Sequence, residues 1–265
     1  MCDRNGCKQY TLKTFGKRKT LMKTLWCLHG NLQQPEVWSE ITQGLQSRMP
    51  ELKIHLVNLW DTLDDDCWDW SDAFCEKVQA IATDQPETQQ YLLAYSLGGR
   101  LAWHALIARP ALWSEAVIVN ADPGIVSLQQ KEQCLRRDRT WANRFLSEPW
   151  EELLTEWDRL PVFCNRPCAT PRLEADFDRS KIARAFEVYS KGQMDDMRSH
   201  LAELSIPITY ITGSEDKRYH QIGVELAHQV PSLRHISIEQ AGHRVPWEQP
   251  ATFLEILHRI LVKSV

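Results

Sequence analysis

The sequence contains no run of about 18 apolar residues, the length that a helix needs to span a bilayer, so we expect no insertion into a membrane. Its first residues, MCDRNGC, lack the apolar stretch of a signal peptide. No basic stripe is present, and the formal net charge is -4. Nucleic acid is therefore not an expected partner, and we expect a cytoplasmic protein.

Paired cysteines at metal-binding spacing are also missing. The chain has 8 cysteines, and its closest pairs, Cys2 with Cys7 and Cys164 with Cys168, lack the C-x-x-C spacing of a zinc site. We expect reduced thiols, because disulfides are rare in the cytosol. No metal and no other cofactor is predicted.

Short apolar strands that alternate with helical patterns are present over most of the chain. The strands are predicted at residues 24–28, 53–57, 90–95, 115–120, 207–212 and 233–238, and the helices at 35–47, 74–82, 97–108, 221–229 and 251–261. Residues before about Thr20 are expected to form a loose or edge element, and residues 58–70 an acidic, tryptophan-rich loop. This alternation predicts an α/β fold, with a mostly parallel sheet and helices on both faces.

Between about residues 125 and 204 the alternation stops and only helical patterns occur. We interpret this stretch as a helical cap inserted into one α/β domain spanning residues 1–265, since α/β folds often reach this size as one unit. Ligands of such sheets bind beyond the carboxyl ends of the strands. Tryptophans of the cap, Trp157 among them, are candidates to line a pocket there.

Ser96 carries the strongest chemical signal. It lies in AYSLGGR, between a predicted strand and a predicted helix, where a serine occupies a tight turn with its hydroxyl above the sheet. Gly98 and Gly99 allow the helix to pack close to the strand. Ala94 stands where glycine is usual, and the alternative interpretation is an ordinary N-cap serine.

The order of the remaining candidates along the chain favours a catalytic serine. His243 follows the last strand in a glycine-flanked loop, and Asp216 follows the strand before it. Serine needs an imidazole to take its proton, and the imidazole needs a carboxylate to fix its tautomer. We therefore predict a Ser96–His243–Asp216 triad, with Glu215 and Asp122 as alternative acids.

The same geometry predicts an oxyanion hole formed by the backbone N–H groups of Leu97 and Asn31. Arg100 lies one helical turn after Ser96, where a cation opposes the helix dipole. Either a carboxylate from the cap or an anionic group of a substrate would explain its position.

Several segments together resemble one family of α/β hydrolases. These are residues 96–100 (SLGGR), 122–124 (DPG), 137–141 (RDRTW), 145–149 (FLSEP), and Trp157 with 160–163 (LPVF). The chain resembles the 2-succinyl-6-hydroxy-2,4-cyclohexadiene-1-carboxylate synthases (MenH) from His29 to His243, and its cap segments carry the specific part of the likeness.

The resemblance implies a lyase of menaquinone or phylloquinone biosynthesis. Such an enzyme eliminates pyruvate from 2-succinyl-5-enolpyruvyl-6-hydroxy-3-cyclohexene-1-carboxylate, with the triad serine acting as a base. A carboxylesterase or thioesterase that forms an acyl-serine is the alternative. The expected partner is a small anionic substrate, and the expected state is a monomer or a weak homo-oligomer.

The chain departs from the family in the residues that would contact substrate. The family's D-x-P-G-H-G-x-S loop reads NLWDTL at residues 58–63. A cap arginine of the family falls near Cys134, so Lys131 or Arg136 would have to replace it. Another falls near Tyr189, with Lys191 and Arg184 close by. The predicted substrate contacts are Arg100, Arg136, Trp157 and Lys191.

Overall fold

The computed structural model describes residues 22–61, 63, 65–85 and 87–263, so the predicted loose element before Thr20 lies outside the described residues. A sheet of six parallel strands has the order β2-β1-β3-β4-β5-β6. The strands are β1 (Met22–Leu28), β2 (Lys53–Val57), β3 (Thr88–Tyr95), β4 (Glu115–Val119), β5 (Ile208–Gly213) and β6 (Leu233–Ile238). The predicted parallel sheet is confirmed, because each expected strand forms and differs from its expected bounds by no more than two residues.

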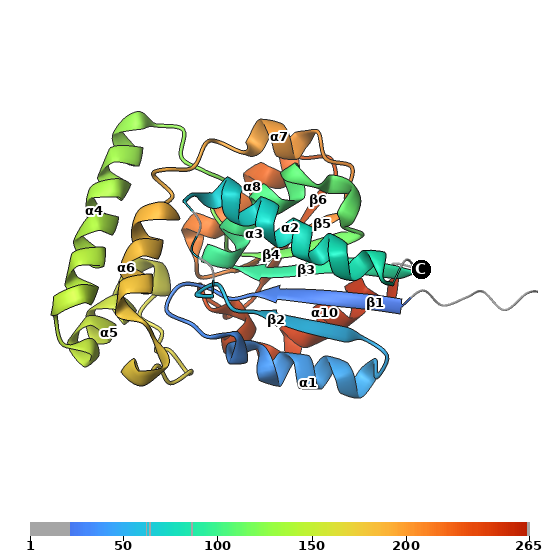
Figure 1. Cartoon of the computed structure of the whole chain (residues 1–265), viewed down its shortest axis with the longest axis horizontal. Coiled ribbons are helices and arrows are strands. Elements are labelled where there is room, and N and C mark those ends of the chain that lie inside the picture. Colours follow the sequence, from blue (N-terminus) through green and yellow to red (C-terminus); the bar gives the residue numbers. More distant parts are fainter. Residues whose placement is uncertain (1–21, 62, 64, 86, 264–265) are drawn as a thin grey trace, which may run out of the picture.

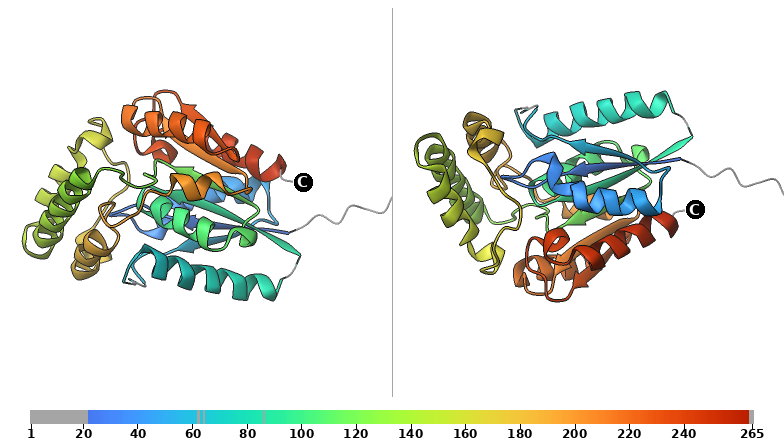
Figure 2. Two further views of the ribbon diagram at one scale, coloured as in Figure 1. Left: turned by 90° about the horizontal axis from the view of Figure 1, so that it is seen from above. Right: turned by 90° about the horizontal axis from the view of Figure 1, so that it is seen from below.

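Helices cover both faces of this sheet (Figures 1 and 2). On one face lie α1 (Ser39–Arg48) and α10 (Pro250–Lys263), which pack in one apolar cluster with the side chains of β1 and β3. On the other face lie α2 (Cys67–Thr83), α3 (Leu97–Ala108) and α8 (Lys217–Gln229), which share a second cluster. Strands buried on both sides read as nearly continuous apolar runs, which is how the sequence reveals them.

The helix α2 starts earlier than its sequence pattern suggests, so the expected loop over residues 58–70 is wrong in its last part. The carboxylate of Asp66 accepts hydrogen bonds from the N–H groups of Trp68 and Asp69, which makes it an N-cap. Trp70 then packs in the core, stacked on Phe74. The cap residue, rather than the apolar periodicity, fixes where this helix begins.

Helices inserted between β4 and β5 lie beyond the carboxyl ends of the strands (Figure 1). They are α4 (Leu128–Ser147), α5 (Trp150–Asp158) and α6 (Arg179–Val188), whereas the short α7 (Arg198–Ala202), also between β4 and β5, packs against α3 and α8. The first three share a separate apolar cluster that includes Trp141, Phe145 and Phe186. We call α4, α5, α6 and the segment 159–178 the cap.

The segment 159–178 departs from the expected continuous helical pattern. It contains only short 3-10 turns, at Pro161–Phe163 and Glu174–Asp176. Pro161, Pro167 and Pro171 interrupt it, and proline has no N–H to donate inside a helix. No described helix is long and apolar enough to cross a bilayer.

Candidate active site

Ser96 sits in a strained turn between β3 and α3. Its φ of 52° and ψ of -107° lie outside the common regions for a residue with a side chain. The turn needs small neighbours: a Cβ on Gly98 would lie 2.5 Å from the carbonyl oxygen of His29, and one on Gly99 would lie 2.4 Å from the Cβ of Ala121. The Ser96 side chain makes no capping hydrogen bond to α3, which leaves its hydroxyl free for other partners.

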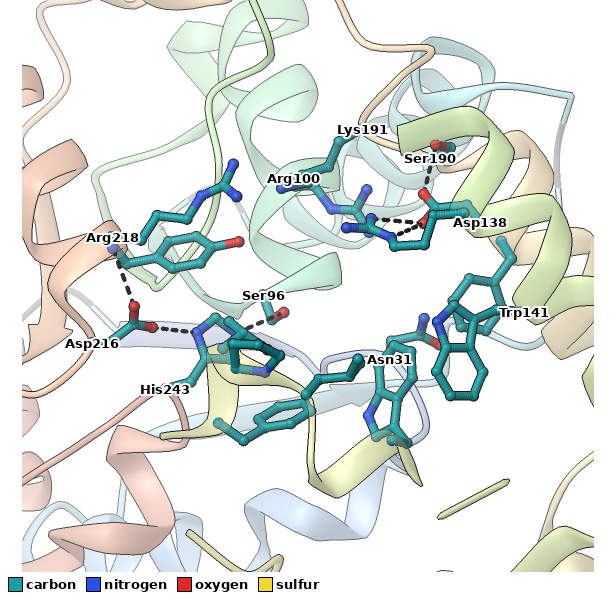
Figure 3. Close-up of a pocket in the computed structure, with 18 of the residues that line it drawn as sticks. Asn31, Ser96, Arg100, Asp138, Trp141, Ser190, Lys191, Asp216, Arg218 and His243 are labelled. Atoms are coloured by element: carbon teal, nitrogen blue, oxygen red, sulfur yellow. Dashed lines mark hydrogen bonds and ion pairs between the residues drawn. The ribbon is translucent and has the colours of Figure 1, made fainter. Parts of the chain in front are cut away.

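The loops after β5 and β6 bring an acid and an imidazole to this hydroxyl (Figure 3). His243 Nε2 lies 3.3 Å from Ser96 Oγ, and His243 Nδ1 lies 2.7 Å from Asp216 Oδ2. The second oxygen of Asp216 accepts the N–H of Tyr219 at 3.2 Å and so caps α8. Both the imidazole and the carboxylate are 3% exposed. The arrangement matches a relay in which Asp216 orients His243 and His243 takes the serine proton.

The two alternative acids have other partners. The Glu215 carboxylate pairs with Arg166 at 2.6 Å. Asp122 lies 3.0 Å from Lys191 Nζ and 3.1 Å from Arg218 Nη2. Burial alone would raise the pKa of Asp122, but Lys191, Arg218 and the N–H of Gly124 hold that pKa below its ordinary value. Of the three carboxylates, Asp216 is the one hydrogen-bonded to the imidazole of His243.

The loop after β1 completes the floor of the site. In the part of the chain that the structure describes, the N–H groups of Leu97 and Asn31 have no protein acceptor. His29 holds this loop: its Nδ1 bonds the carbonyl of Gly30 at 2.8 Å, and its Nε2 accepts the N–H of Leu59 at 3.1 Å. Burial lowers the pKa of His29 to about 4, so its ring is neutral and supports the loop.

A cavity of about 560 Å³ lies between the triad and the cap (Figure 3). Its apolar side includes Trp141 and Trp157, whose rings meet edge to face at a centroid distance of 5.2 Å. Its cationic lining residues are Arg100, Arg137, Lys191, Lys217 and Arg218. Among the described residues, no group of His, Cys, Asp and Glu is arranged to hold a metal ion.

Arg100 reaches the cavity without a carboxylate partner in the described part of the chain. Its Nη1 donates to the backbone carbonyl of Tyr189, at the end of α6. An internal carboxylate from the cap, one of the two explanations for the position of Arg100, is therefore not what the structure contains.

The prediction that Arg136 faces the substrate pocket is wrong, because Arg136 does not line the cavity. Its guanidinium is solvent-exposed and lies 3.5 Å from Glu132 on the outside of α4, and Lys131 pairs with Asp195 at 3.9 Å. Arg137 lines the cavity instead. At about 100° per residue, Arg137 follows the buried row of Cys134, Asp138 and Trp141, whereas Arg136 points to the opposite side. This helical periodicity was the available signal.

Arg137, whose side chain is 54% exposed, is held by the buried Asp138. Its Nε and Nη2 lie 3.0 and 2.7 Å from Asp138 Oδ1, and Ser190 donates to Asp138 Oδ2 at 2.7 Å. Asp138 is 7% exposed. Sequence reasoning also missed Arg218 and Tyr219. They lie two and three residues after Asp216, in the first turn of the helix that this acid caps, and both line the cavity.

The profile of the alpha/beta hydrolase family matches residues 27–256. The chain belongs to the alpha/beta hydrolase family. Within it, the chain is 29% identical over 246 residues to the 2-succinyl-6-hydroxy-2,4-cyclohexadiene-1-carboxylate synthase of Serratia proteamaculans, covering 90% of this chain and 92% of that relative. This relative confirms the resemblance that the cap segments indicated.

Solved structures agree with the fold. The structure of MenH from S. aureus superposes with a TM-score of 0.78 at 20% identity, covering 93% of this chain and 96% of that one. A thermophilic esterase from Thermogutta terrifontis superposes with a TM-score of 0.65 at 17% identity, covering 92% and 90%. At these identities the two structures bear on the fold alone, so the chemistry has to be argued from the site.

Proposed function

We propose that this protein is a lyase that eliminates pyruvate from 2-succinyl-5-enolpyruvyl-6-hydroxy-3-cyclohexene-1-carboxylate, a step of menaquinone or phylloquinone biosynthesis. The observation that carries the proposal is Arg100, a guanidinium beside Ser96 that has no carboxylate partner among the described residues. A carboxylate of the substrate supplies that partner, because guanidinium binds carboxylate through two parallel hydrogen bonds. The likeness to the 2-succinyl-6-hydroxy-2,4-cyclohexadiene-1-carboxylate synthase of Serratia proteamaculans supports the same reaction.

The triad acts here as a base. As the Ser96 hydroxyl passes its proton to His243 Nε2, its oxygen removes the ring proton next to the succinyl ketone. Asp216 accepts a hydrogen bond from the Nδ1–H group of the imidazole and stabilises the positive charge of the imidazolium. The N–H groups of Asn31 and Leu97 hold the negative charge that develops on the ketone oxygen.

Elimination then needs no covalent bond to the protein. The electrons of the broken C–H bond shift the ring double bond, and the C–O bond to the enolpyruvyl group breaks. Pyruvate leaves as its enolate, takes up the proton held on His243 and becomes the ketone, which returns the triad to its starting state. The other cations of the cavity and the ring of Trp157 contact the remaining carboxylates and the apolar ring of the substrate.

A carboxylesterase or thioesterase is the second candidate, because the strained turn at Ser96 and the 3.3 Å contact with His243 also suit attack on an acyl carbon. The two functions differ in their products. We expect the purified protein to release one pyruvate per molecule of the enolpyruvyl substrate, and to turn over activated esters and thioesters slowly. Fast hydrolysis of those acyl compounds, with an acyl group on Ser96 and no pyruvate release, would establish the second candidate instead.

A further inference from the structure

The loops that carry Asp216 and His243 run side by side after β5 and β6. The N–H of Glu215 donates to the carbonyl of Ala241 at 2.9 Å. The approach is so close that a Cβ on Gly213 would lie 2.2 Å from the same carbonyl oxygen. The hydrogen bond between His243 and Asp216 therefore depends on the relative position of these two loops.

Glu248, at the end of the short helix α9 (Val245–Glu248), holds the backbone on both sides of His243. Its Oε1 accepts the N–H of Arg244 at 3.1 Å, and its Oε2 accepts the N–H of Gly242. The carbonyl of His243 accepts the side-chain amide of Asn120 at 2.6 Å. The peptide groups that set the direction of the imidazole are thus fixed by two side chains.

Arg166, in the cap segment 159–178, bridges the two loops. Its Nη2 lies 2.6 Å from Glu215 Oε2, next to Asp216, and its Nε lies 3.4 Å from Glu248 Oε2. Its own carbonyl accepts a hydrogen bond from Arg244 Nη1 at 3.1 Å. The same part of the cap contacts His243 through Phe163, whose ring centroid is 5.8 Å from that of the imidazole.

We propose that Arg166 and Glu248 are positioning residues that hold the His243 and Asp216 loops at the spacing the triad needs, so that the cap controls the geometry of the triad. The inference rests on the proposed function only in taking Ser96, His243 and Asp216 as the reacting groups. It does not depend on which substrate they act on. Neither residue touches the reacting atoms, and both act through the backbone of the two loops.

For the Arg166–Glu215 pair, solvent exposure distinguishes a role in positioning from a role in stability. The Arg166 side chain is 29% exposed and that of Glu215 is 46% exposed, and ion pairs this accessible contribute little to stability. A displacement of about 1 Å at a catalytic group, in contrast, can lower a rate by about a hundredfold. Loss of Arg166 should therefore change the rate far more than the melting temperature.

The test compares Arg166→Gln, Arg166→Lys and Glu248→Gln with Arg48→Gln in the full-length protein. Arg48 pairs with Glu255 at 3.0 Å with side chains 39% and 44% exposed, so it is a matched ion pair away from the triad. The readouts are kcat and KM for pyruvate release, the rate at which a fluorophosphonate modifies Ser96, the downfield proton resonance of His243 Nδ1–H, and Tm.

We expect Arg166→Gln and Glu248→Gln to lower both kcat and the rate of Ser96 modification about tenfold or more, with KM nearly constant and the Nδ1–H resonance shifted or broadened. Arg166→Lys should recover part of the rate, because a single ammonium can still reach Glu215. Arg48→Gln should match the wild type, and the three arginine variants should have similar Tm values. Glu248→Gln should lower Tm, because its side chain is 9% exposed and accepts two backbone N–H groups.

Unchanged Ser96 modification in Arg166→Gln and Glu248→Gln would overturn the inference. A decrease in kcat no larger than that of Arg48→Gln would also overturn it. If the wild type releases no pyruvate, the proposed function fails, but the fluorophosphonate rate and the proton resonance still decide whether Arg166 and Glu248 position the triad.

Discussion

The carboxyl edge of the sheet and the inner face of the cap contribute different chemistry to one cavity. The sheet supplies Ser96, Asp216 and His243 from turns that directly follow β3, β5 and β6. The cap supplies Arg137, Trp141 and Trp157 from the sides of helices. The groups of the triad sit on turns fixed by the sheet, whereas the cap residues named here line the cavity from helices.

The first prediction concerns a cation on the sheet side of the cavity. Arg100→Ala removes the guanidinium that lacks a carboxylate partner among the described residues, and we expect it to lower transition-state binding by about 2–5 kcal/mol. At about 1.4 kcal/mol per factor of ten, kcat/KM for pyruvate release should fall roughly 30-fold to several-thousandfold. Steady-state kinetics check this, and an unchanged kcat/KM would show that Arg100 holds only the carbonyl of Tyr189.

The second prediction concerns two neighbouring cations on the cap. Arg137→Gln should raise KM and lower kcat/KM for pyruvate release about ten- to a hundredfold, because a charge-assisted hydrogen bond to a carboxylate contributes about 1.5–3 kcal/mol. Arg136→Gln should leave both constants at wild-type values, since Arg136 pairs with Glu132 on the outer face. Equal effects of the two substitutions would mean that α4 rotates about its axis when substrate binds.

The sequence predicts the site residues of the sheet region better than those of the cap, because strand ends fix the first and helix rotation fixes the second. The expected positions of Ser96, Asp216 and His243 followed from strand ends, because the carboxyl ends of parallel strands meet at one edge. Choosing between Arg136 and Arg137 required the rotation of α4 about its axis, which the row of Cys134, Asp138 and Trp141 indicates once it is known to face the cavity.

Other features depend on contacts between distant segments. The links from Arg166 to Glu215 and Glu248 join residues 49 and 82 positions apart in the sequence, and no local pattern marks them. The early start of α2 was visible in principle, because Asp66 is a typical N-cap residue. The acidic, tryptophan-rich composition of residues 58–70 favoured a loop instead.

The third prediction concerns stability, in which the sheet region and the cap also differ. Burial lowers the pKa of His29 and of His104 to about 4. The histidines of the unfolded chain have pKa values near 6.5, so between about pH 4 and pH 6.5 the unfolded chain binds more protons than the folded chain. The free energy of unfolding should therefore have its full value above about pH 6.5. It should decrease as the pH falls towards 4, by at most about 1.4 kcal/mol per pH unit for each histidine.

Both of these histidines lie in the sheet region, and α4, α5 and α6 contain none. Hydrogen exchange at about pH 7 and pH 5 should show that the amides of β1, β3 and α3 lose protection on acidification more than those of α4 and α6. Earlier loss of protection in the cap would contradict this assignment of the acid-sensitive groups.

The most direct test of the account is the release of pyruvate from the enolpyruvyl substrate by the wild type and by Ser96→Ala, measured with protein of matched folding. We predict steady release by the wild type and a rate lower by at least about a thousandfold in the variant, because the hydroxyl that removes the ring proton is gone. Release by Ser96→Ala within tenfold of the wild-type rate would contradict the account.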